Sequence, residues 1–193
     1  ALIGAANTLI FRDDGKIHAD NTDGYGFIQN LRSGAPNWDP KSGPAAVIGA
    51  GGATRAVLAS LIDVGVTEIR LSNRTRARAE SLRDEFGAKI VVYDWFQADN
   101  KLDGAVTVVN SSSRGMVGKA DFRVPLDALS PTAVVSDLVY TPLDTSLLIG
   151  ARALGCVTVD GLGMLLHQAV PAFERWFGYR PDVDEETRRV VLG

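Results

Sequence analysis

Apolar, β-branched runs alternate with helical patterns from residue 45 onward. The runs are AAVIG at 45–49, EIRLSN at 68–73, KIVVYDW at 89–95, AVTVVNSSS at 105–113, AVVSDLVY at 133–140 and CVTVD at 156–160. Helical patterns begin at about Ala53 and Arg76. Such alternation predicts parallel strands joined by crossover helices. The expected fold class is therefore α/β, with a doubly wound parallel sheet.

The two ends of the chain follow other patterns. The segment ANTLIFRDDGKIHAD at 6–20 predicts two strands around a turn at Asp13, Asp14 and Gly15, followed by a helical segment near 24–31. The loop at 33–44, rich in Gly, Pro and Ser, indicates a domain boundary. Residues 161–178 show apolar positions at helical spacing, and Pro171 is expected to kink that helix.

Composition narrows the class of protein. A length of 193 residues suits one domain, or one domain and part of another, and a net charge of -3 gives no reason to expect nucleic acid or an anionic membrane as partner. The single cysteine, Cys156, favours a cytoplasmic location and a buried position. No signal peptide or membrane-spanning run is found, and no His or Cys cluster has metal-ligand spacing, so His18 and His167 are expected at surface or packing positions. The chain starts without methionine, within a predicted strand, which suggests processing or a missing upstream segment.

The glycines after the first run of the alternating region predict a phosphate site. Gly49 permits a tight turn, Gly51 lets the backbone approach a pyrophosphate, and the start of the following helix offers free N–H groups. Thr54 occupies the third position of the fingerprint, which is normally Gly or Ala. The alternative is a purely structural turn, but the strand before it and the helix after it favour a dinucleotide. The expected ligands are Gly49, Ala50, Gly51, Gly52 and Ala53.

The segment LSNRTRARAE at 71–80 selects between dinucleotides. An NAD-binding protein normally carries Asp or Glu at the end of the second strand, where this chain has Ser72, Asn73 and Arg74. Guanidinium groups hold a 2′-phosphate through charge-assisted hydrogen bonds. Arg74 and Arg78, four residues apart, can share one helical face. NADP(H) is therefore the expected cofactor, held by Asn73, Arg74, Thr75 and Arg78, and a solvated basic helix start is the alternative.

Six motifs together resemble the shikimate dehydrogenase family. They are GAANTL, DNTDGYGF, GAGGATRA, NRTRARA, SDLVYTPLDT and DGLGMLLHQA, in this order. The resemblance implies a Rossmann-like NADP domain at 36–160, part of a second α/β substrate-binding domain with a linker helix at 1–35, and C-terminal helices at 161–193 that return to it. It also implies NADP-dependent interconversion of 3-dehydroshikimate and shikimate, in aromatic amino acid biosynthesis.

The family's site residues carry over to matching positions. Asp23 is the acidic member of a lysine–aspartate catalytic pair, although Asp23 equally suits a helix cap. Asn7, Asp23, Tyr140 and Gln168 are the expected substrate ligands, and Leu138, Gly161 and Met164 join the cofactor contacts. Met164 and Gln168 lie four residues apart on one predicted helical face; a core methionine and a solvated glutamine are the alternative.

The sequence departs from the family in two respects. The Ser-x-Ser segment and the catalytic lysine are absent, because none of Lys16, Lys41, Lys89, Lys101 and Lys119 matches that position, so we expect this chain alone to be catalytically incomplete. Arg114 stands where the family has a small residue or proline. Alternatives are a quinate or aminoshikimate dehydrogenase and a non-catalytic regulatory relative. The expected partner is a small-molecule substrate, and a homodimer is compatible with the sequence.

Overall fold

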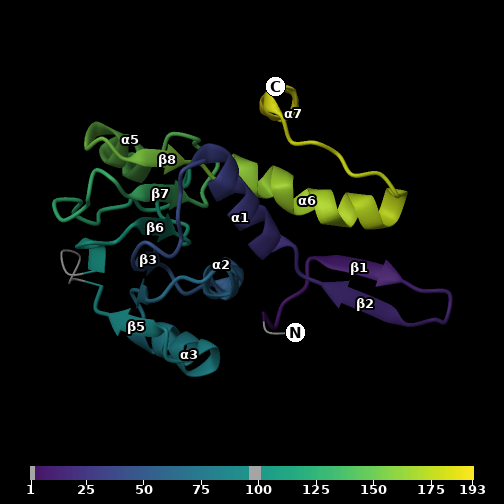
Figure 1. Cartoon of the computed structure of the whole chain (residues 1–193), viewed down its shortest axis with the longest axis horizontal. Helices are drawn as coiled ribbons and strands as arrows, with labels where there is room; N and C mark the ends of the chain where they lie inside the picture. The colour runs from purple at the N-terminus through teal and green to yellow at the C-terminus, as the bar shows by residue number, and fades with distance from the viewer. Residues whose placement is uncertain (1–2, 96–100) are drawn as a thin grey trace.

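The computed structural model describes residues 3–95 and 101–193. Its main element is a six-stranded parallel sheet in the order β5-β4-β3-β6-β7-β8 (Figure 1). The strands are β3 (Ala45–Ile48), β4 (Ile69–Ser72), β5 (Ile90–Tyr93), β6 (Thr107–Asn110), β7 (Val134–Asp137) and β8 (Val157–Val159). The prediction of a doubly wound α/β sheet is confirmed.

Helices connect the parallel strands and cover the sheet. Their bounds are α2 (Gly52–Asp63), α3 (Arg76–Phe86) and α5 (Ser146–Ala153). Strands β3, β6 and β7 are buried along their whole length, which explains their continuous apolar runs. Strand order reverses at β3, which pairs with β4 on one side and β6 on the other. Open α/β sheets bind ligands at this switch point, outside the carboxyl ends of the strands.

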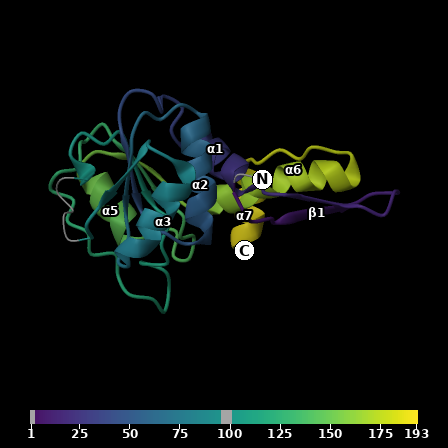
Figure 2. The ribbon, with the colours of Figure 1, turned by 90° about the horizontal axis from the view of Figure 1, so that it is seen from below.

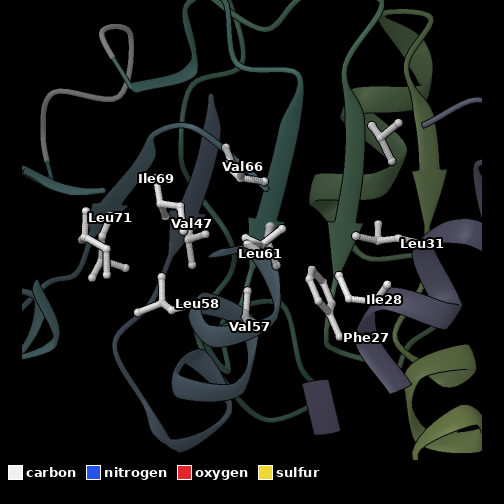
Figure 3. Packing of buried hydrophobic residues seen from close by; sticks show 14 of the residues in the cluster. Phe27, Ile28, Leu31, Val47, Val57, Leu58, Leu61, Val66, Ile69 and Leu71 are labelled. Atoms are coloured by element: carbon white, nitrogen blue, oxygen red, sulfur yellow. The ribbon is translucent and has the colours of Figure 1, made fainter. Parts of the chain in front are cut away.

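The N-terminal residues form a hairpin and a helix. Strands β1 (Thr8–Phe11) and β2 (Ile17–Asp20) pair antiparallel with Phe11 opposite Ile17, so the predicted turn at 13–15 lies between them. Helix α1 (Asp23–Gly34) follows and is longer than the predicted segment at 24–31. Its residues Phe27, Ile28 and Leu31 pack on one face of the sheet beside α2 (Figure 3).

Helix α1 crosses α6 (Leu162–Phe177) at close range because glycines face the partner helix. A Cβ atom on Gly26 would lie 2.7 Å from the carbonyl oxygen of Met164, and one on Gly163 would lie 1.9 Å from Asn30 Oδ1. Any side chain at Gly26 or Gly163 would therefore separate the helices. The Asn30 amide also donates to the carbonyl oxygen of Asp160 at 2.7 Å. Helix α6 continues through Pro171 and ends at Phe177, with Gly178 as its C-cap.

The hairpin and the C-terminal half of α6 project together from the sheet region (Figures 1 and 2). Trp176 Nε1 donates to the carbonyl oxygen of Leu9 at 3.2 Å, and Arg175 pairs with Asp20. The last helix, α7 (Glu185–Leu192), is tied back by Arg188, which pairs with Asp160 at 2.8 Å. None of the helices in residues 3–95 and 101–193 has the length and hydropathy to cross a bilayer.

Candidate functional site

The glycine turn connects β3 to α2 at the switch point. Gly49 has φ of +123°, and a Cβ there would lie 2.9 Å from the backbone carbon of Ser111. Both the backbone conformation and the close approach therefore require glycine. Gly51 is the N-cap of α2, and a Cβ at Gly51 or Gly52 would meet nothing within 4 Å. The N-terminus of α2 thus has open space in front of its free N–H groups, as an anionic ligand requires.

Thr54 links this turn to the loop after β6. The Gly51 N–H donates to Thr54 Oγ1 at 3.0 Å, and Thr54 Oγ1 lies 2.9 Å from Ser111 Oγ. Ser111 Oγ in turn donates to the carbonyl oxygen of Ile48 at 3.2 Å. Thr54 is fully buried, so its hydroxyl is fixed by these partners. The unusual residue at the third fingerprint position therefore holds the turn in place through hydrogen bonds.

A cavity of about 420 Å³ lies in front of the glycine turn. Asn73, Arg74 and Arg78 line it together with residues of the loops after β5 and β6. Its lining residues are Gly49, Ala50, Gly51, Asn73, Arg74, Arg78, Trp95, Ser111, Ser112, Ser113, Arg114, Lys119 and Ala120. The cavity therefore combines the glycine turn with the basic segment that the sequence singled out.

Three positively charged side chains without hydrogen-bond or ion-pair partners distinguish this cavity among the described residues. Among the described residues, the side chains of Arg74, Arg78 and Lys119 have no hydrogen-bond or ion-pair partner, and no carboxylate is part of the lining. Arg76, which points elsewhere, pairs with Glu80 at 2.8 Å and with Asp94. Asn73 Nδ2 donates to the carbonyl oxygen of Thr75 at 2.8 Å. Three uncommitted cations beside a helix N-terminus favour a ligand with several phosphate groups.

The other predicted cofactor ligands lie outside the lining of this cavity. Gly52 and Thr75 adjoin lining residues in the chain, and Ala53 follows Gly52. Gly161 packs on the end of β7, since a Cβ there would lie 2.3 Å from the carbonyl oxygen of Leu138. Met164 belongs to the core cluster around α1 and is 8% exposed. The predicted contacts of Leu138, Gly161 and Met164 with a cofactor stay predictions, and the packing of Met164 matches the alternative of a core methionine.

Two predicted substrate ligands are hydrogen-bonded to each other. Asn7 Nδ2 donates to Asp23 Oδ1 at 2.9 Å, although the residues are 16 positions apart. Asn21 Nδ2 donates to the other carboxylate oxygen at 3.2 Å, and Asn21 Oδ1 accepts from the Asp23 N–H at 3.0 Å. The N-cap of α1 is Thr22, which makes no side-chain cap bond. The Asp23 carboxylate is thus held by two amides and does not cap the helix.

The other two predicted substrate ligands, Tyr140 and Gln168, form no hydrogen bond with Asn7 or Asp23 among the described residues. Tyr140 is 44% exposed and lies just after β7, whereas Gln168 is half-buried on α6 with its Cβ against Gly26. Gly26 lies about one helical turn after Asp23, so Gln168 packs on α1 close to the end that carries this carboxylate. His167 is half-buried, and burial together with the nearby Arg188 lowers its pKa. Within the described residues, no group of three or more His, Cys, Asp or Glu side chains could hold a metal ion.

A second cavity, of about 920 Å³, lies between the N-terminal segment, α1 and α2. None of the predicted site residues lines it, and its walls include the apolar side chains of Ile3, Ile28 and Phe86. It is larger than the cavity at the glycine turn, but its lining includes the carboxylates of Asp20 and Asp63 and no part of the glycine turn. We therefore place the candidate cofactor site at the glycine turn.

Asp137, at the carboxyl end of β7, is a buried carboxylate that accepts three hydrogen bonds. No role was predicted for it from the sequence. Its Oδ1 accepts from Asn110 Nδ2 at 2.8 Å and from the Val139 N–H at 3.0 Å, and its Oδ2 accepts from Thr145 Oγ1 at 2.7 Å. Burial raises the pKa of Asp137 to about 6, and the three hydrogen bonds oppose that rise. The carboxylate holds the loops after β6 and β7 in a common arrangement.

The variant Asp137→Asn is expected to change the pH dependence of stability. Because its folded-state pKa is raised, wild-type Asp137 binds its proton more tightly in the folded state, and the protein loses stability as pH rises through about 6. Asparagine keeps the shape and the acceptor oxygen but cannot ionise. The variant's free energy of unfolding, relative to wild type, should rise by about 3 kcal/mol at most between about pH 4 and pH 8. Urea unfolding measures this. Parallel profiles of wild type and variant, as expected for the exposed control Asp144→Asn, would contradict it.

Several lining residues were not predicted from the sequence. The sequence assigns no role to Trp95 and Lys119, and it shows Arg114 only as a departure from the family. Asn21, which lies outside this cavity and donates to Asp23, has no predicted role either. Position offered one usable signal: Trp95 and Arg114 both follow the carboxyl end of a parallel strand, the edge where such sheets bind ligands.

Comparisons with known proteins identify the family of this chain. Residues 37–122 match the model described as Shikimate / quinate 5-dehydrogenase, and residues 161–190 match the Shikimate 5'-dehydrogenase C-terminal domain. The NADP(+) shikimate dehydrogenase of Cereibacter sphaeroides is 73% identical over 192 residues, which are 100% of this chain and 69% of that protein.

Solved structures are similar as well. Quinate dehydrogenase from Corynebacterium glutamicum, in complex with NAD, matches with a TM-score of 0.90 and 34% identity over 99% of this chain and 68% of that one. Shikimate 5-dehydrogenase from Thermus thermophilus, in complex with NADP(H) and shikimate, matches with a TM-score of 0.80 and 36% identity over 94% of this chain and 65% of that one.

Proposed function

Because the chain belongs to the shikimate dehydrogenase family, we propose that it serves the NADP-dependent interconversion of 3-dehydroshikimate and shikimate. The observation that carries this proposal is the cavity at the glycine turn, with its three free cations and no carboxylate among the described lining residues. NADP bears a pyrophosphate and a 2′-phosphate, so both the charge and the open helix N-terminus fit it.

The glycine turn and the two arginines are proposed to bind different phosphate groups of the cofactor. The backbone at Gly49, Ala50 and Gly51 would hold the pyrophosphate, and Arg74 and Arg78, which follow β4, would bind the 2′-phosphate. An acidic residue at this position would repel that phosphate. When bound, the reduced nicotinamide supplies the hydride. The protein contributes orientation and charge compensation, and its remaining task is the proton on the substrate oxygen.

Asp23 is the group proposed to handle that proton. Reduction of a ketone to a secondary alcohol adds a proton to oxygen, and oxidation removes it, so an acid–base group must lie beside that oxygen. Asn7 and Asn21 donate to the two Asp23 oxygens and orient the carboxylate. Asn7, Tyr140 and Gln168 are proposed to bind the substrate's hydroxyl or carboxylate groups. A lone carboxylate is a weak base for an alcohol, which is why the family pairs it with a lysine.

The hairpin, α1 and α6 are proposed to belong to the substrate-binding part of the enzyme, with the domain boundaries near residues 35 and 160. The hairpin and the end of α6 expose Phe11, Ile17, Trp176 and Phe177 on their surfaces. These apolar side chains fit packing against the further part of the relatives, of which this chain covers 69% in the Cereibacter sphaeroides protein. A cytoplasmic location and a homodimer remain part of this proposal.

The preference for NADP over NAD tests the proposed function. Replacing Arg74 by alanine removes one charge-assisted phosphate contact, which is worth about 1.5 to 3 kcal/mol, or roughly tenfold to a hundredfold in affinity. We therefore expect Arg74→Ala to lose NADP affinity by this factor and to keep its NAD affinity, as measured by calorimetry. Arg74 lies two residues before α3, and Arg83→Ala, on α3 but outside the cavity, is the control. Equal affinity of wild type for NAD and NADP would overturn the assignment.

Quinate is the second candidate substrate, because the similar Corynebacterium glutamicum structure is a quinate dehydrogenase. Turnover of quinate with NAD, in preference to shikimate with NADP, would favour it. A non-catalytic regulatory relative would bind the cofactor but show no turnover even when the rest of the family's length is supplied.

A further inference from the structure

Arg114 and Trp95 form a wall of the cofactor cavity that the glycine and arginine motifs do not explain. The Arg114 guanidinium carbon lies 5.1 Å from the centroid of the Trp95 ring, within cation–π distance. Arg114 Nη1 also donates to the carbonyl oxygen of Asp121 at 3.3 Å. Both residues line the cavity and both are half-buried, so the pair is held in a defined position facing the cavity.

Trp95 is anchored from the protein interior by a second cation. Lys101 Nζ lies 5.3 Å from the Trp95 ring centroid and donates to the Trp95 carbonyl oxygen at 3.4 Å. Lys101 is fully buried and is not part of the cavity lining, whereas Arg114 is. Lys101 therefore fixes the Trp95 ring from the protein interior, and Arg114 contacts the same ring at the cavity.

The position of the pair on the sheet indicates what it meets. Trp95 lies two residues after β5, and Arg114 lies four residues after β6, on either side of the strands that carry the glycine turn and Arg74. The purine of NADP is attached to the ribose that carries the 2′-phosphate, so it must lie beside Arg74 and Arg78. Among the described lining residues Trp95 is the only aromatic one, and Arg114 is the cation stacked with it.

We propose that the Trp95–Arg114 pair is the adenine-binding wall of the cofactor site, with the Arg114 guanidinium plane stacking on the purine. This inference rests on the proposed function, because it assumes that the cavity takes an adenine dinucleotide. Guanidinium groups stack on flat π systems, and a plane already fixed by an aromatic ring and a carbonyl oxygen loses little freedom on binding. Arg114 thereby contributes to adenine recognition, and the 2′-phosphate is left to Arg74 and Arg78.

Two adenosine probes separate stacking from phosphate binding. The variant Arg114→Leu is expected to bind 5′-AMP and 2′,5′-ADP about tenfold more weakly than wild type, by the same factor for both. Arg123→Leu removes an exposed arginine of the same loop and should leave both affinities unchanged. Calorimetry gives the affinities, and thermal unfolding checks that each variant is folded. A loss confined to 2′,5′-ADP would make Arg114 a phosphate ligand and overturn the stacking proposal, as would unchanged affinities.

Tryptophan fluorescence provides a second readout that does not depend on the Arg114 variant. Binding of 5′-AMP to wild type is expected to change the tryptophan emission, and Trp95→Phe should remove that change while Trp38 and Trp176 continue to emit. An emission change that persists in Trp95→Phe would place the purine elsewhere. If wild type binds neither NADP nor 2′,5′-ADP, the proposed function itself fails; if it binds both and the Arg114 and Trp95 variants behave as wild type, only the adenine wall fails.

Discussion

Asp23→Asn is expected to lower the turnover of shikimate about a hundredfold to ten-thousandfold, the usual contribution of a positioned acid–base group. The substitution keeps the shape of the side chain and removes its capacity to take a proton. The protein for this experiment is the 193-residue chain joined to the N-terminal part of the Cereibacter sphaeroides relative, of which the chain itself covers 69%. NADPH formation is followed by its absorbance at about 340 nm.

Control proteins distinguish a loss of acid–base chemistry in Asp23→Asn from a loss of folding or of cofactor binding. Asp14→Asn changes an exposed carboxylate in the hairpin turn and should retain wild-type turnover. NADPH affinity should be nearly unchanged in Asp23→Asn, because Asp23 does not line the cavity at the glycine turn. The unextended chain should bind NADPH but turn over shikimate poorly, since it lacks the family's lysine. Wild-type turnover in Asp23→Asn would show that its hydrogen bonds to Asn7 and Asn21 are structural only.

Gly51→Val is expected to reduce NADP affinity about a hundredfold or more without unfolding the protein. A Cβ at Gly51 meets no protein atom within 4 Å, and the backbone at this position is extended, so valine fits the folded chain. Its methyl groups would occupy the space in front of the α2 N-terminus, where at least two phosphate contacts are expected, each worth about 1.5 to 3 kcal/mol. Calorimetric titration with NADP measures the loss.

The folding cost of this variant is expected to be small. Replacing an N-cap glycine by an apolar residue costs about 1 kcal/mol or less, so thermal unfolding should shift by only a few degrees. Gly51→Ala, with a smaller side chain, should give a smaller loss of affinity. Full NADP affinity in a folded Gly51→Val protein would mean that the phosphates do not approach this turn.

Local patterns in the sequence were sufficient to predict the eight strands of the described residues, most of the helices, the glycine turn and the basic segment, although α5 was not predicted. Runs such as AAVI at β3 are buried on both faces, which makes their apolar character continuous and easy to detect. The hairpin turn, the glycine turn and the basic start of α3 depend on residues within a few positions of one another. Gly49 adopts a positive φ, which glycine tolerates better than other residues, so the glycine itself indicated a tight turn at this position.

Only the tertiary structure decided which of these segments meet. The Asn7–Asp23 hydrogen bond spans 16 residues and requires the hairpin to fold back beside α1. Arg74, Arg114 and Lys119 line one cavity because parallel strands end at one edge of the sheet, and Thr54 reaches Ser111 for the same reason. Met164 shows the converse: its helical spacing from Gln168 was visible in the sequence, but the close crossing of α1 and α6 at Gly26 buries it in the core. Periodicity identifies the side of a helix that a residue occupies, whereas strand order and helix packing determine what lies against that side.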